Sequence, residues 1–126
     1  MSVNKVILLG NVGRDPAIRY VGTRPVAEIA LATNERSTTS ADGSSAPERT
    51  EWHRLVLWDA NAELAEKYIR KGSRIYVEGK LRTRIWEDRT AIKHSVTEIY
   101  VDTIELMSRA QYPTRQTKRN NRFYQS

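Results

Sequence analysis

The sequence has 126 residues with no cysteine and two histidines, which fits one domain with a short extension and excludes disulfides, thiol nucleophiles and metal centres built from Cys or His. Its apolar runs are far shorter than the roughly 20 residues of a membrane span, and no secretory signal pattern opens it, so we expect a cytoplasmic protein. Of the net charge of +6, +5 lies in residues 108–126, which hold five cations and no acid, so charge alone does not mark residues 1–107 as a binder of polyanions.

Three extended segments are predicted first, over residues 3–12, 26–34 and 51–59. Within the second, Ala27, Ile29 and Leu31 alternate with their neighbours, as expected for a strand with one buried face. Residues 36–50 are rich in Ser and Thr and contain Asp42-Gly43, which predicts a mobile hairpin loop between the second and third strands.

A helix is predicted next, begun by a cap at Asp59 or Asn61 and ended by a left-handed Gly72. One face of this helix carries Leu64, Ala65, Tyr68 and Ile69. A long strand follows over residues 73–86, and residues 92–107 are expected to form one or two more strands. The order of elements fits an all-β fold with one helix, the five-stranded Greek-key barrel of the oligonucleotide-binding (OB) fold, with the helix between the third and fourth strands. A small β-sandwich fits the same order and stays open.

Two strands combine aromatic and basic side chains on one face, because residues two apart in a strand point the same way. In the fourth strand, Lys80, Arg82, Arg84 and Trp86 oppose an apolar face of Ile75, Val77, Leu81 and Ile85. In the third strand, Trp52, Arg54, Val56 and Trp58 oppose His53, Leu55 and Leu57. Single-stranded nucleic acid needs this mixture, since cations neutralise its phosphates and aromatic rings stack on its unpaired bases.

Other interpretations of the same residues remain open at this point. Tryptophans on a small barrel often pack in the core or at a subunit interface, and arginines on an edge strand can protect it from aggregation. His53 faces the apolar side and is expected to be structural rather than catalytic. An enzyme is disfavoured, because the sequence contains no phosphate-binding Gly-rich loop, metal-ligand cluster or nucleophile elbow.

Several blocks of the sequence resemble the bacterial single-stranded DNA-binding protein family, across roughly residues 3–107. They are Asn4-Lys5-Val6-Ile7-Leu8-Leu9-Gly10-Asn11-Val12-Gly13, Ala30-Leu31-Ala32-Thr33-Asn34, Thr50-Glu51-Trp52-His53-Arg54-Leu55-Val56-Leu57-Trp58, Tyr68-Ile69-Arg70-Lys71-Gly72-Ser73 and Val77-Glu78-Gly79-Lys80-Leu81-Arg82-Thr83-Arg84-Ile85-Trp86. The resemblance implies an OB-fold domain over residues 1–107 that binds single-stranded DNA without sequence preference or catalysis, in replication, recombination and repair. It also implies a homotetramer, no cofactor, and a cytoplasmic, nucleoid-associated location in bacteria.

The resemblance also implies roles for individual residues. Those expected along the DNA path are Trp52, Arg54, Trp58, Tyr68, Lys71, Lys80, Arg82, Arg84 and Trp86. Those expected at the subunit interface are Lys5, Val6, Ile7, Leu8 and His53, with the first strand paired to its copy in a neighbouring subunit.

Two departures from the family pattern alter the expectation. Ser37 stands where some relatives carry another tryptophan, so one stacking platform is missing. Residues 108–126 form a basic tail, expected to be disordered, in place of the acidic tip through which relatives recruit other proteins. Recruitment of that kind is therefore not expected. An alternative function is a protein-interaction or primosome-type assembly factor that uses the basic tail and the strand edges.

Overall fold

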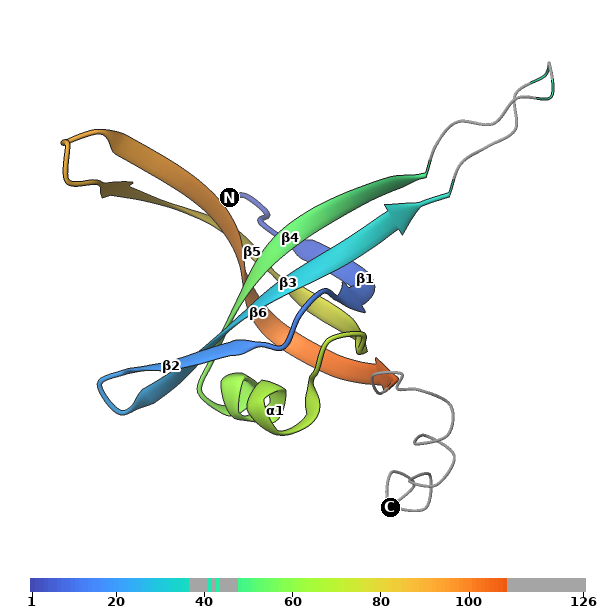
Figure 1. Cartoon of the computed structure of the whole chain (residues 1–126), viewed down its shortest axis with the longest axis horizontal. Coiled ribbons are helices and arrows are strands. Elements are labelled where there is room, and N and C mark those ends of the chain that lie inside the picture. Colours follow the sequence, from blue (N-terminus) through green and yellow to red (C-terminus); the bar gives the residue numbers. More distant parts are fainter. Residues whose placement is uncertain (37–40, 42, 44–47, 109–126) are drawn as a thin grey trace.

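The computed structural model describes residues 1–36, 41, 43 and 48–108. Along the chain the elements are β1 (Val6–Val12), β2 (Ala17–Val21), β3 (Arg24–Glu35), β4 (Arg49–Trp58), α1 (Ala60–Tyr68), β5 (Arg74–Glu87) and β6 (Lys93–Ser108). Figure 1 shows them as one strongly twisted sheet with α1 at one end and long hairpins reaching outward. The basic tail and Ser37 lie outside the described residues, apart from Ser108.

Five of the strands close into a barrel. The sheet order is β1-β5-β6-β4-β3-β2, and β1 pairs again with β3 through Asn11 and Val12, which closes the ring. All neighbours are antiparallel except β4 and β6, which run parallel. This topology confirms the predicted OB fold, with the helix between the third and fourth barrel strands, and excludes the sandwich.

Strand β2 was missed by the sequence prediction, which left residues 13–25 without an element. The segment pairs antiparallel with the first half of β3 and adds a hairpin outside the ring. Four of its five residues are exposed, apart from half-buried Ile18, so it lacks the regular apolar alternation that reveals a half-buried strand. Residues 92–107 were expected to form one or two strands, and the structure has a single strand there, β6 (Lys93–Ser108).

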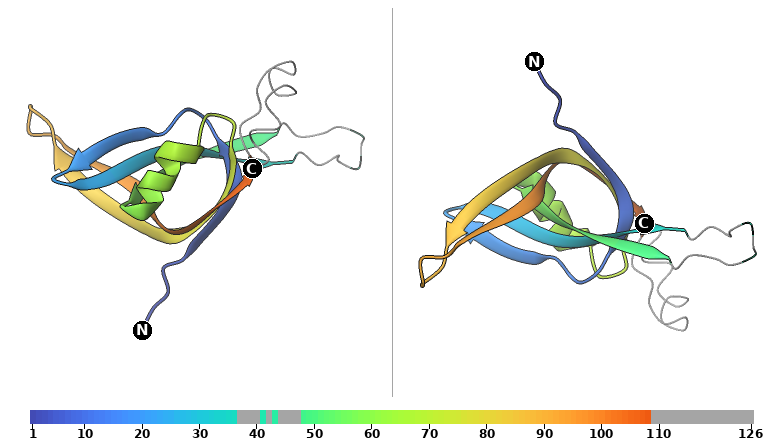
Figure 2. Two further views of the ribbon diagram at one scale, coloured as in Figure 1. Left: turned by 90° about the horizontal axis from the view of Figure 1, so that it is seen from below. Right: turned by 90° about the horizontal axis from the view of Figure 1, so that it is seen from above.

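The core fills the barrel and extends under the helix. It is built from the inward residues of the strands, among them Leu31, Leu55, Leu57 and Ile75, together with Ala62 and Ala65 of α1. Figure 2 shows α1 lying across one opening of the barrel. The predicted inward faces of β3 and β4 are therefore confirmed, since Ala27, Ile29 and Leu31 are buried and so are Leu55 and Leu57. Val56 was predicted on the outer face, but it is only 4% exposed, so β4 is buried on both faces at this point.

The structure confirms the predicted left-handed Gly72 after the helix, but it contradicts the predicted cap at Asp59 and the predicted packing of Tyr68. Gly72 has a φ of 92°, the left-handed conformation expected after the helix. Asp59 precedes α1, but its side chain makes no capping hydrogen bond and instead pairs with Arg24. Leu64, Ala65 and Ile69 of the predicted apolar face pack in or against the core, but Tyr68 is exposed.

The β5–β6 hairpin extends beyond the barrel as an arm, seen at the upper left of Figure 1. Its strands keep pairing from Lys80–Tyr100 out to Glu87–Lys93, where no core lies beneath them. Leu81 and Ile85 were expected on a buried apolar face, and they are 49% and 69% exposed. The predicted alternation along β5 is right, but alternation alone does not tell where the core ends.

Candidate nucleic-acid interface

One outer face runs across four neighbouring strands. Directly paired residues of antiparallel strands point to the same side of a sheet. The pairs Ala32–Trp52 and Ala30–Arg54 join β3 to β4, while Arg84–Val96 and Trp86–His94 join β5 to β6. The ion pairs of Glu98 close the gap between β4 and β5, so the predicted third-strand and fourth-strand faces form a single surface.

Two carboxylates hold the arginines at the centre of this surface. Arg54 donates from Nε to Glu98 and from Nη2 to Glu28, each at 2.7 Å. Arg84 donates to both carboxylate oxygens of Glu98, at 3.2 and 3.3 Å. These hydrogen bonds raise the pKa of Arg84. Both guanidiniums remain partly exposed, so they can still contact a ligand from the outer side.

Trp52 lies on the outer face at the side of the barrel. Its side chain is exposed, and the far edge of its indole lies against Gly13. A Cβ at that position would fall 2.4 Å from Cζ3 of the ring, so only glycine leaves room for the indole here. Trp52 therefore presents a ring to solvent in a position set by the backbone beside it.

Trp86 occupies the arm and is oriented by the opposite strand. The ring of His94 stacks on it with centroids 4.5 Å apart and an angle of 21°. His94 Nε2 lies 2.8 Å from Asp88, whose other oxygen accepts hydrogen bonds from the backbone N–H groups of Thr90 and Ile92. These contacts, led by His94, lower the pKa of Asp88 to about 2. His94, held by Asp88 in the turn of the arm, thus covers one face of Trp86, and the tryptophan side chain remains half exposed.

Of the three tryptophans predicted to stack on bases, Trp58 is the least exposed. It is half-buried, and the guanidinium of Arg24 lies 4.4 Å from the centroid of its ring. Two hydrogen bonds to Asp59, at 3.1 and 2.8 Å, hold Arg24 there and lower the pKa of that carboxylate. One face of Trp58 is therefore occupied before any ligand binds.

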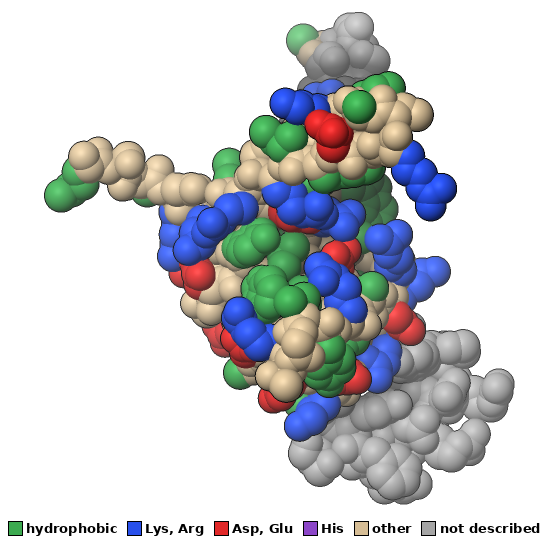
Figure 3. Space-filling view, turned by 90° about the vertical axis from the view of Figure 1, so that its left-hand side faces the viewer, with side chains coloured by type: hydrophobic (Ala, Val, Ile, Leu, Met, Phe, Trp, Pro, Cys, Tyr) green, Lys and Arg blue, Asp and Glu red, His purple; other side chains and the backbone are tan. Residues whose placement is uncertain are grey.

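The remaining predicted basic and aromatic residues divide into two places. Lys80 and Arg82 belong to the same outer face of β5, and Arg82 lies over the ring of Tyr100 at 5.0 Å. Tyr68 and Lys71 lie near the end of α1, where the backbone N–H of Lys71 donates to Asp15 at 2.8 Å. The space-filling view in Figure 3 shows Lys and Arg side chains interspersed with hydrophobic ones over the face at the arm end.

Four of the five residues predicted at a subunit interface lie on β1 or directly before it, and the fifth, His53, lies on β4. Ile7 is exposed, whereas Val6 and Leu8 are half-buried and pack against the core. Lys5 pairs with Glu78 at 2.9 Å, which raises the pKa of the lysine. The Nε2 atom of His53 lies 2.8 Å from the hydroxyl of Thr33, in keeping with a structural role inside the subunit.

Sequence reasoning missed four residues of this surface. They are Arg14, Arg24, Glu28 and Glu98. Arg14 and Arg24 lie outside the predicted strands, and the alternation of β6 gave no sign that Glu98 is buried beneath two arginines. In the part of the chain that the structure describes, no three His, Cys, Asp or Glu side chains are grouped to hold a metal ion, and no helix has the length and hydrophobicity of a membrane span.

Comparisons with known proteins show the family to which this chain belongs. A curated single-stranded DNA-binding protein of Bacteroides thetaiotaomicron is 50% identical over 109 residues, covering 86% of this chain and 68% of the relative. A solved structure described as a Plasmodium falciparum SSB complex with ssDNA superposes with a TM-score of 0.76 at 36% identity, covering 86% of this chain and 97% of the other. The model of the single-strand binding protein family matches residues 3–107, and the chain belongs to that family.

Proposed function

We propose that this protein binds single-stranded DNA on the outer face described above, without catalysis and with little sequence preference. Two exposed indoles, Trp52 on β4 and Trp86 on the arm, lie on one surface with Arg54 and Arg84 between them. This arrangement is the observation that carries the proposal. Stacking on an indole accepts any base, and the guanidiniums supply charge for the phosphates.

The proposed site comprises the residues that the sequence analysis predicted, and we expect them to contribute unequally to the affinity for DNA. Trp52, Arg54, Arg84 and Trp86 form its centre. Lys80 and Arg82 continue it along β5, and Tyr68 and Lys71 extend it toward the end of α1. Trp58 contributes less, because it is more buried than Trp52 and Trp86 and Arg24 covers one of its faces.

We also propose that the protein acts as a homo-oligomer, a tetramer by analogy with the family. Strand β1 pairs with β5 along its length but with β3 only through Asn11 and Val12. Ile7 and Leu9 are exposed on this strand, at 58% and 44%. A second copy of β1 would cover both side chains and pair with the open edge. Light scattering, alone and with a long thymidine oligonucleotide, measures the subunit count.

A fluorescence titration with oligo(dT) tests the binding function. Stacking is worth about 1–3 kcal/mol per base, so Trp52→Ala and Trp86→Ala should each weaken binding by roughly 5- to 150-fold. Tyr20→Ala, which removes an exposed aromatic residue of β2 outside this surface, serves as the matched control and should bind as the unchanged protein does. Binding that both tryptophan variants retain in full would contradict the proposal and favour a protein-interaction role.

The cellular role proposed with this activity is protection of unpaired DNA during replication, recombination and repair in the bacterial cytoplasm. A chain that contacts DNA by stacking and charge suits all three processes, since each exposes single strands of arbitrary sequence. Its affinity should fall steeply with salt, because every phosphate contact releases counterions.

A further inference from the structure

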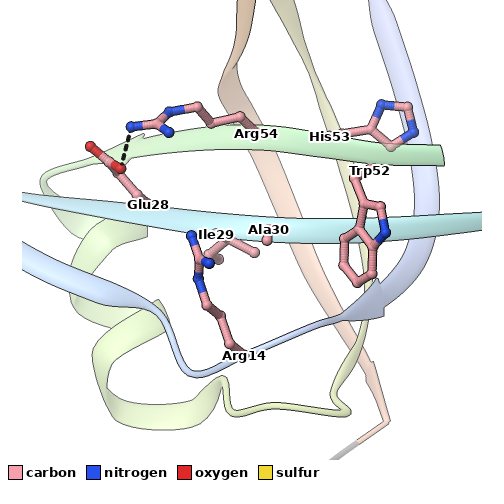
Figure 4. A pocket seen from close by; sticks show the side chains of 7 residues that line it. All are labelled: Arg14, Glu28, Ile29, Ala30, Trp52, His53 and Arg54. Carbon is pink, nitrogen blue, oxygen red and sulfur yellow. Dashed lines mark hydrogen bonds and ion pairs between the residues drawn. The ribbon is translucent and has the colours of Figure 1, made fainter.

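A hollow on the outer face lies between Trp52 and Arg14. Two depressions in the described surface share Arg14, Ala30 and Trp52 among their lining residues. In Figure 4 the indole comes from β4 and the Arg14 side chain from the segment after β1, with Ala30 of β3 between them. The hollow therefore has an aromatic ring at one side, a guanidinium at the other and a methyl group at its floor.

The backbone on either side of Arg14 is fixed by hydrogen bonds. The N–H of Gly13 donates to the carbonyl oxygen of Ala30 at 2.9 Å, which ties this segment to β3. On the other side, a carboxylate oxygen of Asp15 accepts the N–H of Lys71 at 2.8 Å. The turn that carries Arg14 is thus held against the barrel before any ligand arrives, which lowers the entropy lost on binding.

Arg14 differs from four other arginines near this surface in its charge balance, and among the described residues it shares its lack of an ion pair with Arg82, which lies over the ring of Tyr100. Arg19, Arg24, Arg54 and Arg84 each form an ion pair with a carboxylate. Arg14 is exposed and forms no ion pair with any residue that the structure describes. Its donors are therefore available to an external anion, whereas Arg19, Arg24, Arg54 and Arg84 are already partly neutralised.

A nucleotide matches both ends of this hollow. Its base is planar and apolar on its faces, which suits the indole and the methyl floor, and its phosphate suits a guanidinium that can pair with two oxygens at once. We propose that this hollow, the Trp52–Arg14 subsite, holds one unpaired nucleotide, with its base stacked on Trp52 above Ala30 and its phosphate paired with Arg14. The inference rests on the proposed function and adds Arg14 and Ala30 to the residues that bind DNA.

Two substitutions separate the charge of the subsite from its shape. Arg14→Gln removes one phosphate contact, so the salt dependence of binding to oligo(dT), as the slope of log K against log salt, should fall in magnitude by about 0.7. The same relation predicts affinity about fivefold weaker at 0.1 M salt, with the difference vanishing toward 1 M. Ala30→Leu fills the floor and keeps the charge, so it should weaken binding at least about fivefold with an unchanged slope, since one stacked base is lost.

Lys67→Gln is the matched control, because it removes one exposed cation from α1 outside the subsite. It should keep both the affinity and the slope of the unchanged protein. Circular dichroism and a melting curve establish that each variant is folded at the titration temperature.

The outcomes distinguish the subsite from the broader function. An Arg14→Gln protein that matches Lys67→Gln in affinity and slope would overturn the role of Arg14, and an Ala30→Leu protein with full affinity would overturn the placement of the base. If the unchanged protein does not bind oligo(dT), the proposed function itself fails, and the subsite fails with it.

Discussion

Arg54 Nε lies 2.7 Å from a carboxylate oxygen of Glu98, and the glutamate side chain is 2% exposed while the arginine side chain is 42% exposed. The anion is thus buried beneath cations that face solvent, and it also binds Arg84. A buried carboxylate with two arginine partners fixes both guanidiniums in place on the outer face. Glu98 therefore shapes the proposed interface without contacting a ligand.

Glu98→Gln should lower the free energy of unfolding, because it removes hydrogen bonds between charged groups at a buried position. Such bonds contribute about 1.5–3 kcal/mol. Urea unfolding at one fixed protein concentration measures the change. Glu105→Gln, at an exposed position of the same strand, is the control and should stay within about 0.5 kcal/mol. Equal urea midpoints for the two variants would show that the hydrogen bonds of Glu98 do not stabilise the fold.

Trp58→Ala should weaken binding to oligo(dT) less than Trp52→Ala does. The reason is that Arg24 already covers one face of Trp58, whereas Trp52 is 59% exposed. Parallel fluorescence titrations at one salt concentration compare the two losses. A loss at Trp58 as large as that at Trp52 would mean that Arg24 moves aside or joins the contact.

Gly13→Ala should displace the Trp52 indole, because the added methyl group meets the ring at 2.4 Å and the indole is free to swing toward solvent. The fold should persist, and the affinity for oligo(dT) should fall toward that of Trp52→Ala. A double-mutant cycle supplies the control: in the Trp52→Ala background the same glycine change should have little further effect on affinity. Additive losses would instead place Gly13 in a role of its own.

Asp88→Ala should loosen the turn of the arm. Asp88 has its pKa lowered to about 2, so its contribution is complete above the ordinary value of 3.8 and is lost as the pH falls toward 2. At neutral pH, the Thr90 and Ile92 amides, which donate to this carboxylate, should exchange with solvent faster in the variant, as hydrogen-exchange NMR can measure. The amide of Ala91, which donates to the Asp88 backbone carbonyl, is the internal comparison and should change less. Unchanged exchange at Thr90 and Ile92 would contradict the role of the side chain.

The inward and outward faces of the barrel strands were predictable from the sequence. Leu55 and Leu57 are buried and Trp52 and Arg54 are exposed, because alternation along a strand is a local property of the extended backbone. The same rule failed at Leu81 and Ile85, since it ranks the two faces of a strand but does not say how far the core extends beneath it.

The amino-acid sequence alone determined the helix, the long barrel strands and the aromatic and basic character of two strand faces, because short-range periodicity and turn residues carry that information. These local patterns missed β2 and fitted both a barrel and a sandwich, until the pairing of β1 with β3 decided for the barrel. Only the tertiary structure decided which charges meet. Arg54 and Glu98 are 44 residues apart and become neighbours through the parallel pairing of β4 with β6. Arg14 reaches Trp52 because β1 closes the ring against β3. Contacts of this kind depend on the register between distant strands, which no local pattern records.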